Sequence, residues 1–395
     1  MSGATTTDFY QGPPLGDLID GRKLVVCVGS GGVGKTTTAA AIGLQAAIRG
    51  RKVLVLTIDP ARRLANSLGL SRFGNDETRI DLSALPEAKG ELWAMMLDNQ
   101  KTFDDLIERI SPSPERRDAI LKNRIYRATA DNISGSQDYM ATEKLYDVVE
   151  TGRYDLVVLD TPPVKNALDF LEAPGRLARF LDKRVMKWFL SPYDKERVFG
   201  RLLTSTSAVV FRLLSYVFGR EFLDDLAEYF QHFRDLYDGF RERQEAVVEM
   251  FHDRRRTCFL VVCAPNGPSL EVARFFLDEL HARRMPNPGV IVNQRHLTLG
   301  DSLDARAELG TDIDRLGADL PPAARSSLLA RLGAAHRRLL GLSLAEESLV
   351  KGLLGALRAD QVSWQVPRLD DEVNDLGGLS RVGGFLFERQ APLGD

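Results

Sequence analysis

The chain has 395 residues, of which 44% are hydrophobic, and its formal net charge at neutral pH is −3. This length exceeds one ordinary compact domain, so we expect either one large α/β domain with an insertion or two domains. The dispersed basic residues and the slightly acidic balance argue against a nucleic-acid-binding surface. Three cysteines without metal-site spacing suit a protein of the reducing cytoplasm.

The N-terminal residues 1–20 are polar and contain no apolar core segment. We therefore expect a disordered tail here and not a signal peptide. The longest apolar stretch, residues 202–218, contains Arg212 and several hydroxyl side chains. It falls short of a membrane span, so we expect a protein that does not cross a membrane.

A glycine-rich segment, residues 29–36, lies between the apolar run 24–28 and the helix-forming residues 37–42. This is the G-x-x-x-x-G-K-[ST] phosphate-binding loop in the strand–loop–helix context that the motif requires. Its glycines let backbone N–H groups converge on phosphate oxygens, and the helix N-terminus favours negative charge. We expect Lys35 to bind the β- and γ-phosphates and Thr36 to bind Mg²⁺. The candidate nucleotide-binding residues of this segment are Gly29, Ser30, Gly31, Gly32, Val33, Gly34, Lys35, Thr36 and Thr37.

The second apolar run, residues 53–58, is followed by Asp59 and Pro60. Aspartate before proline is a favourable helix start, with the aspartate as N-cap. A carboxylate at this position can also orient or deprotonate the water that attacks the γ-phosphate. The two roles are compatible, and we expect Asp59 and Lys35 to be the catalytic residues.

A later apolar run, residues 156–160, ends in Asp160 and continues into Thr161 and two prolines. A carboxylate at the carboxyl end of a strand, in the same sheet as a phosphate-binding loop, can hold a magnesium-bound water. We therefore expect Thr36 to bind the metal directly and Asp160 to bind it through water.

Residues 176–253 have helical periodicity and no convincing strand. Apolar residues at 4-3-4-3-4 spacing between Phe222 and Phe240 form one stripe along a helix. Two interpretations stay open: a helical subdomain that buries its own apolar surface, or a groove that receives an apolar helix of a partner. We expect this insertion to divide a core made of residues 21–175 and 254–395.

Seven short apolar runs occur along the chain, and amphipathic helical stretches separate most of them. The runs are Lys23–Val28, Val53–Ile58, Leu92–Leu97, Leu156–Asp160, Cys258–Ala264, Gly289–Asn293 and Val362–Val366. Runs this apolar are buried on both faces, as parallel strands are. The pattern predicts an α/β fold with a doubly wound, mostly parallel sheet, although it does not predict the strand order.

The remaining polar candidates are weaker. Asn293 ends its run, and its amide can read the adenine edge or form a turn. Cys258 and Cys263 are five residues apart on one strand, so they lie on opposite faces and cannot chelate one ion. The five histidines show no ligand spacing, and we expect no zinc site.

A dinucleotide-binding fold is an alternative interpretation of the same residues. Gly29, Gly31 and Gly34 satisfy G-x-G-x-x-G, and Asp59 stands where that fold places its ribose-binding acid. Such a fold has no use for Lys35 and Thr36, so the nucleoside triphosphate interpretation is favoured.

Taken together, these motifs resemble the ArsA-type ATPases, the family of arsenite-pump ATPases and tail-anchored-protein targeting ATPases. Residues 29–37 are similar to the family's first motif. Asp59-Pro60-Ala61 resembles its first switch, whose aspartate positions the hydrolytic water, and Asp160-Thr161-Pro162 resembles its second switch.

Three later segments extend the resemblance. The turn of residues 265–271, which begins at Pro265, resembles the family's adenine loop, and residues 292–294 resemble its adenine-reading segment. Residues 366–373 are similar to its closing strand and loop. The resemblance implies a cytoplasmic, Mg²⁺-dependent ATPase whose nucleotide state switches a dimer. It also implies that the helical insertion handles an apolar client helix or a membrane-associated partner.

The chain departs from the family pattern at the second position of the glycine loop. The family normally has a lysine there that reaches the partner's phosphates across the dimer interface, whereas this chain has Ser30. The zinc-binding C-x-x-C of some members and a cysteine cluster suited to arsenite are also absent. Ser30 predicts either a heterodimer with a related ATPase that keeps the lysine, or a homodimer in which Arg62 or Arg63 replaces it.

Two other functions stay open at this stage. A regulatory subunit would bind ATP with little activity of its own, which Ser30 favours and Asp59 opposes. A partitioning or division-site ATPase carries similar switches, but such proteins are shorter and bind DNA or end in a membrane helix.

Overall fold

The computed structural model describes residues 13–58, 63–69, 76–123, 136–162, 242–296 and 321–388, together with Tyr216, Gly219 and Phe222. Asp59, Pro60, Ala61 and Arg62 of the predicted first switch lie outside the described residues, as does most of the predicted helical insertion. None of the helices in the described ranges is long and apolar enough to cross a membrane.

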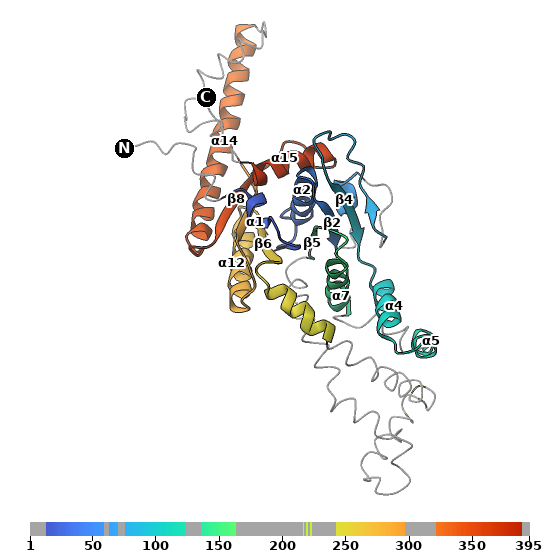
Figure 1. The fold of residues 1–395 in the computed structure, drawn as a ribbon. Coiled ribbons are helices and arrows are strands. Elements are labelled where there is room, and N and C mark those ends of the chain that lie inside the picture. Colours follow the sequence, from blue (N-terminus) through green and yellow to red (C-terminus); the bar gives the residue numbers. More distant parts are fainter. Residues whose placement is uncertain are drawn as a thin grey trace, which may run out of the picture.

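Within these ranges, one sheet of eight strands forms the centre of the molecule (Figure 1). The strands are β1 Leu24–Gly29, β2 Lys52–Thr57, β3 Thr78–Arg79, β4 Glu91–Met96, β5 Leu156–Asp160, β6 Thr257–Cys263, β7 Gly289–Arg295 and β8 Val362–Pro367. Their spatial order is β3-β4-β2-β5-β1-β6-β7-β8, and every pair is parallel except β3 with β4. The prediction of an α/β fold with a mostly parallel sheet is confirmed.

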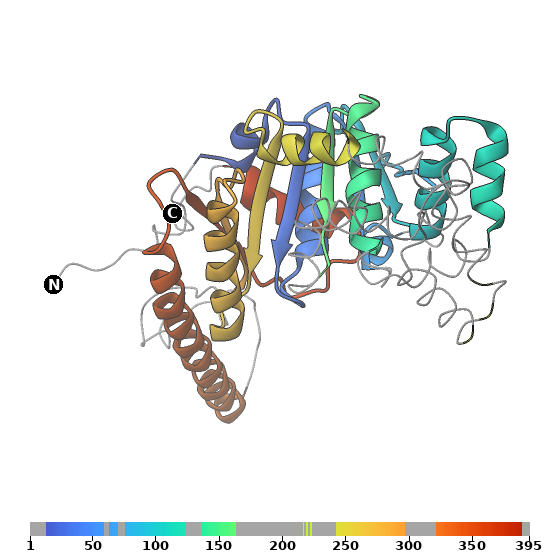
Figure 2. The same ribbon diagram turned by 90° about the horizontal axis from the view of Figure 1, so that it is seen from below.

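Helices cover both faces of this sheet (Figures 1 and 2). The helices of the described ranges are α1 Leu15–Ile19, α2 Lys35–Ile48, α3 Arg63–Ser67, α4 Asn99–Ile110, α5 Pro114–Lys122, α7 Ser136–Glu150, the helix of residues 242–252, α12 Gly267–Ala282, α14 Pro322–Leu354 and α15 Leu376–Phe387. Of these, α4 packs on α7 and α5 on α4, beside the sheet and not over it (Figure 1). One apolar core lies between the sheet and α1, α2 and α15, and the other lies under α7, the helix of residues 242–252 and α12.

The central strands are buried on both faces, which explains why their sequences are continuously apolar. In β1, Leu24, Val26 and Val28 point to one core, whereas Val25 and Cys27 point to the other. With helices on both sides, no position of the strand faces water, so no polar alternation develops. All seven predicted runs are strands to within two residues at either end. The short antiparallel β3 was missed because two residues carry no periodicity.

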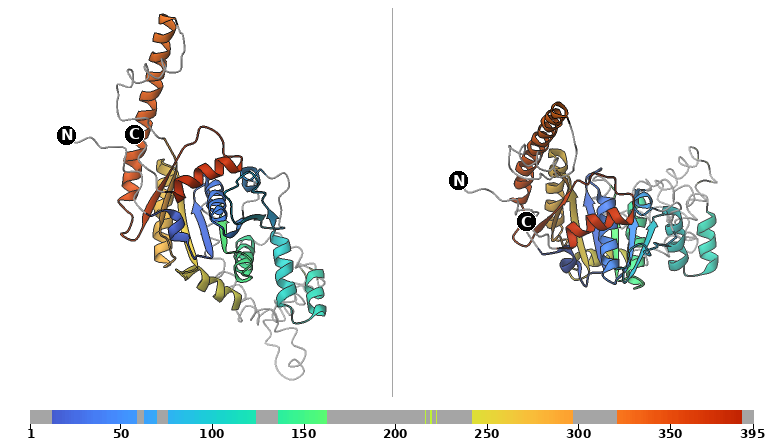
Figure 3. Two further views of the ribbon diagram at one scale, coloured as in Figure 1. Left: turned by 45° about the horizontal axis from the view of Figure 1, so that its top comes forward. Right: turned by 90° about the horizontal axis from the view of Figure 1, so that it is seen from above.

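Helix α14 is the longest described helix, with 33 residues. At a rise of about 1.5 Å per residue it is about 50 Å long. Its C-terminal part packs on α12 and β7, whereas its N-terminal part extends well beyond the sheet (Figure 3).

The structure differs from the expectation of a disordered tail through residue 20. Leu15 and Ile19 of α1 are fully buried in the core beside α15, and the indole Nε1 of Trp364 donates to the carbonyl of Pro13 at 3.2 Å. Residues 13–20 are therefore part of the folded core, and residues 1–12 lie outside the described ranges. A five-residue helix with two apolar side chains is too short for its periodicity to be recognised.

A buried ion pair joins α7 to the helix of residues 242–252. Arg243 bonds the carboxylate of Glu143, which is almost fully buried, and the guanidinium also lies 5.1 Å from the ring centroid of Tyr146. Burial raises the pKa of Glu143, and the charge of Arg243 opposes that shift. The carboxylate therefore depends on this partner to stay ionised inside the protein.

We expect Arg243→Ala to lower the free energy of unfolding by about 3–5 kcal/mol, because the buried carboxylate of Glu143 loses its guanidinium partner. The matched control is Arg256→Ala, since Arg256 pairs with Glu150 at an exposed position and is expected to contribute about 1 kcal/mol or less. Urea unfolding followed by circular dichroism measures both variants. Equal losses in the two variants would contradict the importance of the buried pair.

Candidate functional site

The glycine-rich segment lies where β1 ends and α2 begins, at the carboxyl edge of the sheet. The predicted strand–loop–helix context is therefore present. Strand β1 lies between β5 and β6, so the connections that follow β1 and β5 lead to opposite sides of it. In open parallel sheets, ligands bind at the carboxyl edge where the strand order reverses in this way.

Two glycines of this loop adopt backbone conformations or contacts that a side chain would disturb. Gly34 has a left-handed φ of +84°, and a Cβ there would lie 2.3 Å from Nδ2 of Asn293. A Cβ at Gly29 would lie 2.0 Å from the carbonyl oxygen of Val262 in β6. The loop is therefore packed against the ends of β6 and β7, and only glycine fits at both positions.

Lys35 folds back over the loop that precedes it. Its Nζ donates to the carbonyl oxygens of Gly29 at 3.1 Å and Ser30 at 2.8 Å, and the residue is buried. The ammonium group is thus held at the mouth of the loop, beside the first turn of α2. A positive charge in this place suits the oxygens of a phosphate chain.

Asp160 joins three elements at the carboxyl edge. One carboxylate oxygen, Oδ2, accepts hydrogen bonds from Oγ1 of Thr36 at 2.7 Å and from Oγ1 of Thr57 at 3.0 Å. Asp160 is only 1% exposed, and its register partners are Cys27 in β1 and Thr57 in β2. Hydroxyl and carboxylate oxygens are the ligands that Mg²⁺ prefers, so Thr36 and Asp160 fit a magnesium site.

Thr57 was missed in the sequence. The available signal was a hydroxyl residue that ends an otherwise apolar strand, but only the register with Asp160 gives it a role. The next residue, Ile58, donates its backbone N–H to the carbonyl of Asp160 at 3.2 Å. The described chain therefore reaches the phosphate-binding edge one residue before Asp59.

Asn293 and Gln294 at the end of β7 contact the phosphate-binding loop directly. Nδ2 of Asn293 donates to the carbonyl of Val33 at 2.9 Å, and Nε2 of Gln294 donates to that of Gly32 at 3.3 Å. Gln294 has a left-handed φ of +60°. The amide of Asn293 therefore supports the loop, a role that was not predicted for it.

A cavity of about 430 Å³ opens beside these residues. Its lining residues include Gly34 and Thr37, Asn293 and Gln294, and residues from Pro367 at the end of β8 to Asn374. Pro265 is buried at the end of β6 and is not among the described residues that line the cavity. The structure thus brings Asn293 and the segment after β8 together at the cavity, but not Pro265.

The turn after β6 contacts the loop at Ser30 instead. Oγ of Ser30 lies 3.0 Å from Oγ of Ser269, which also accepts the backbone N–H of Ala264 at 2.9 Å. Asn266 caps α12 by accepting from the backbone N–H of Ser269 at 3.1 Å. The side chain of Ser30 is therefore bonded within its own chain.

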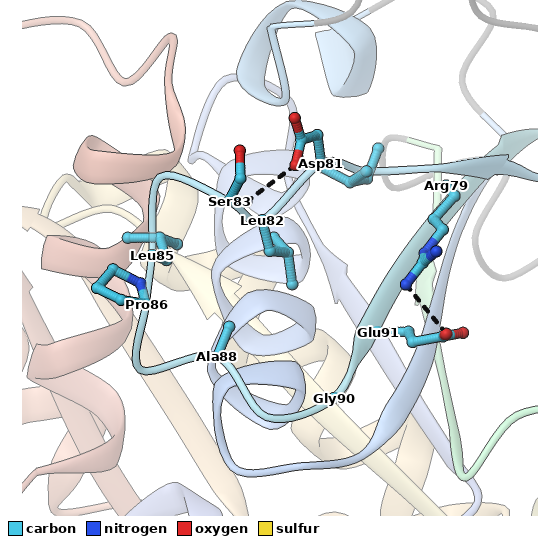
Figure 4. Close-up of a pocket in the computed structure, with 10 residues that line it drawn as sticks. Arg79, Asp81, Leu82, Ser83, Leu85, Pro86, Ala88, Gly90 and Glu91 are labelled. Atoms are coloured by element: carbon cyan, nitrogen blue, oxygen red, sulfur yellow. Dashed lines mark hydrogen bonds and ion pairs between the residues drawn. The ribbon is translucent and has the colours of Figure 1, made fainter.

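A second cavity, of about 520 Å³, lies in the loop between β3 and β4 (Figure 4). Its charged side chains already have partners, since Arg79 pairs with Glu91 at 3.1 Å and Asp81 accepts the backbone N–H of Ser83 at 2.9 Å. None of the glycine-loop residues, Lys35 or Asp160 is among the described residues that line it. The cavity beside the glycine loop is therefore the candidate site.

The cysteines are free and buried. Cys258 and Cys263 point into opposite cores, as their spacing predicted. Burial raises the pKa of each of these two thiols to about 12, and it also raises the pKa of Cys27 well above its usual value. No three His, Cys, Asp or Glu side chains in the described ranges are grouped so that they could hold a metal ion.

The parallel sheet, the glycine loop with Lys35, and the Thr36–Asp160 pair define a P-loop nucleoside triphosphatase. Residues 22–305 match the family model described as anion-transporting ATPase, and this segment is more than half of the chain. The chain belongs to this family of ATPases, so the resemblance to the ArsA-type ATPases is confirmed.

Curated relatives with the same activity in their names match over most of their length. The chain is 27% identical over 300 residues to ATPase get3 of Pyrenophora tritici-repentis, which covers 74% of this chain and 80% of the relative. It is 27% identical over 296 residues to ATPase GET3 of Malassezia globosa, and this match covers 74% of this chain and 80% of the relative. A third relative, ATPase GET3 of Phaeosphaeria nodorum, is 27% identical over 298 residues, and this match covers 74% of this chain and 83% of the relative.

We expect Gly34→Ala to destabilise the nucleotide-free protein more than Gly32→Ala does. Both glycines have positive φ, so either substitution strains the backbone by about 1–2 kcal/mol. A Cβ at Gly34 also meets the amide of Asn293, whereas a Cβ at Gly32 meets nothing within 4 Å, so Gly34→Ala should cost about 1–3 kcal/mol more. Thermal unfolding without nucleotide measures the difference, and equal losses would contradict the packing of the loop against β7.

Proposed function

We propose that this chain binds Mg²⁺-ATP at the glycine loop and hydrolyses it, and that its nucleotide state switches a dimer. The observation that carries this proposal is the cluster at the carboxyl edge, where Lys35, Thr36 and Asp160 meet beside the loop. In an ATPase family, such a cluster is suited to bind a triphosphate and its metal ion.

Each described residue has a role in this proposal. The loop amides and the start of α2 bind the phosphates, and Lys35 exchanges the carbonyls of Gly29 and Ser30 for the β- and γ-phosphate oxygens. Thr36 and Asp160 hold the magnesium ion, the latter through water. The bound ion neutralises charge that develops on the phosphates. Thr57 keeps the carboxylate of Asp160 in place.

Asp59 is the proposed catalytic residue that orients or deprotonates the attacking water. Support comes from its position directly after Ile58, whose backbone N–H bonds the carbonyl of Asp160. A carboxylate has the chemistry that activation of water requires.

The cavity beside Gly34 is the proposed adenine site. Because Nδ2 of Asn293 already donates to Val33, the amide oxygen is the group that can accept from the exocyclic amine of adenine. Residues between Pro367 and Asn374 also line the cavity. Pro265 is not assigned to the base.

We further propose that the dimer forms with a related ATPase that keeps the lysine at the second position of its glycine loop. Alternatively, it forms between two copies of this chain in which Arg62 or Arg63 replaces that lysine. Ser30 supports this, because its short side chain is bonded to Ser269 of the same chain. By the resemblance to tail-anchored-protein targeting ATPases, the insertion of residues 176–253 holds an apolar client helix or a membrane-associated partner. The three free, buried cysteines suit a cytoplasmic site of action.

A regulatory subunit that binds ATP with little turnover is the second candidate function. The Ser30–Ser269 contact favours it, because the chain then supplies no positive charge from this position to a partner's phosphates. The intact Asp59 opposes it. The effect of Asp59→Asn on turnover by the chain together with a related ATPase separates the two candidates, because only hydrolysis at this chain's own site depends on Asp59.

Two variants separate binding from hydrolysis. We expect Lys35→Ala to abolish binding of Mg²⁺-ATP, because the phosphates lose their buried positive charge. Asp59→Asn should keep binding and lower turnover by about 10²-fold or more, because only water activation is lost. Calorimetry measures binding, and phosphate release measures turnover. Retained turnover in Asp59→Asn would reduce Asp59 to a helix cap, and absence of ATP binding by the unmodified chain would contradict the proposed function.

The dimer proposal predicts that a nucleotide-trapped form associates. Sedimentation of Asp59→Asn with Mg²⁺-ATP should show a larger species than the same protein without nucleotide, either alone or with an added related ATPase. In the homodimer version, Arg62→Ala or Arg63→Ala should slow turnover. Fast turnover by the monomeric chain that neither substitution changes would contradict both versions.

A further inference from the structure

The side chain of Glu346 on α14 contacts the turn at the end of β7. Oε2 of Glu346 accepts the backbone N–H of His296 at 2.9 Å, and Oε1 lies 2.5 Å from Nδ1 of the His296 imidazole. The same carboxylate lies 3.8 Å from the guanidinium of Arg295. Glu346 therefore contacts both residues that follow Gln294.

This anchor is largely removed from water. Arg295 is 2% exposed, and the side chain of Glu346 is 12% exposed. Burial lowers the pKa of Arg295, and the charges of Glu346 and, to a smaller extent, Glu347 oppose that shift. A buried guanidinium requires nearby negative charge, so loss of Glu346 disturbs the position of Arg295.

The backbone held by this anchor is irregular. Gln294 is a non-glycine residue with a left-handed φ of +60°, and the pairing of β7 with β8 shifts register between Val292 and Arg295. Regular ladder contacts resume where Arg295 pairs with Pro367 and its carbonyl accepts from Arg368 at 2.8 Å. A strained residue persists only where its surroundings hold it, and Glu346 bonds the backbone two residues beyond it.

The strained turn places two amides on the phosphate-binding loop. Asn293 and Gln294 donate to the carbonyls of Val33 and Gly32, and both line the cavity beside Gly34. A displacement of the turn therefore moves the support of the loop and one wall of the cavity together. Helix α14, which carries Glu346, lies outside the residues 22–305 that match the family model.

We propose that Glu346 is a positioning residue for the nucleotide: it holds Arg295 and His296 so that Asn293 and Gln294 keep the glycine loop and the cavity in binding geometry. This inference rests on the proposed binding of ATP at that cavity. It makes α14 part of the nucleotide-binding unit, although the helix contributes no residue to the lining of the cavity. A displacement of this part of α14 then changes the affinity of the protein for the nucleotide.

The test compares Glu346→Ala with Glu347→Ala in the full chain. Glu347 is the next residue, its side chain is 45% exposed, and it pairs with Lys351 one turn further along α14. We expect Glu346→Ala to weaken Mg²⁺-ATP binding about tenfold or more, as loss of a residue that orients binding groups does. The kcat at saturating ATP should change little. Glu347→Ala removes a second charge near Arg295 but keeps the hydrogen bonds of Glu346 to His296, so its affinity should stay within about twofold of that of the unmodified chain.

Glu346→Gln serves as the conservative variant if Glu346→Ala folds poorly. It keeps an acceptor for the backbone of His296 but removes the charge beside Arg295, so its affinity should lie between those of the unmodified chain and Glu346→Ala. Affinities of both Glu346 variants within twofold of Glu347→Ala would overturn the proposal. If the unmodified chain binds no Mg²⁺-ATP in the same titration, the proposed function fails, and the affinity argument fails with it.

Hydrogen–deuterium exchange without nucleotide tests the anchor independently of ATP. Loss of Glu346 should speed exchange in peptides that cover residues 289–296 and 29–36, while the peptides of β2 and β5 keep their protection. Uniform acceleration over the whole sheet, or no change in the two segments, would overturn the positioning role.

Discussion

Asp160 accepts hydrogen bonds from two threonine hydroxyls that belong to α2 and β2, while its own backbone continues β5 beside β1. An ionised carboxylate buried to this extent is costly unless polar groups surround it. The parallel register supplies those groups, because it brings Thr57 level with Asp160 and places the start of α2 at the same edge. Residues 36, 57 and 160 are far apart in the sequence, and the site depends on the sheet that unites them.

The strands and the glycine loop could be predicted because their physical causes are local. A parallel strand covered on both faces must be apolar throughout, as β1 and β6 are, and a phosphate-binding loop requires glycine at fixed places. The strand order could not be predicted, because it depends on which helices cross which face. Helix α1 and strand β3 escaped prediction because each is too short for a period to develop.

The site was predicted less completely than the fold. Lys35, Thr36 and Asp160 have side-chain chemistry that points to phosphate and magnesium, and the structure brings all three to one edge. Asn293 was predicted either to read a base or to form a turn, and its amide donates to the glycine loop, a role that only a tertiary contact reveals. Pro265 was assigned by resemblance, and it is not among the described residues that line the cavity, whereas the segment after β8 is. Glu346 had no local signal, since one glutamate on a long helix is unremarkable until its partners are known.

The buried cysteines have a consequence for handling and observing this protein. Cys27 and Cys258 lie on the adjacent central strands β1 and β6, where Cys27 pairs with Leu260 and Cys258 with Val25, and Cys263 ends β6. Alkylating reagents and oxidants react with the thiolate, and burial suppresses both ionisation and access. The folded chain is therefore protected against oxidative damage at these positions without any disulfide. Modification can proceed only when the middle of the sheet opens. The rate of thiol labelling therefore reports how often the central strands open transiently.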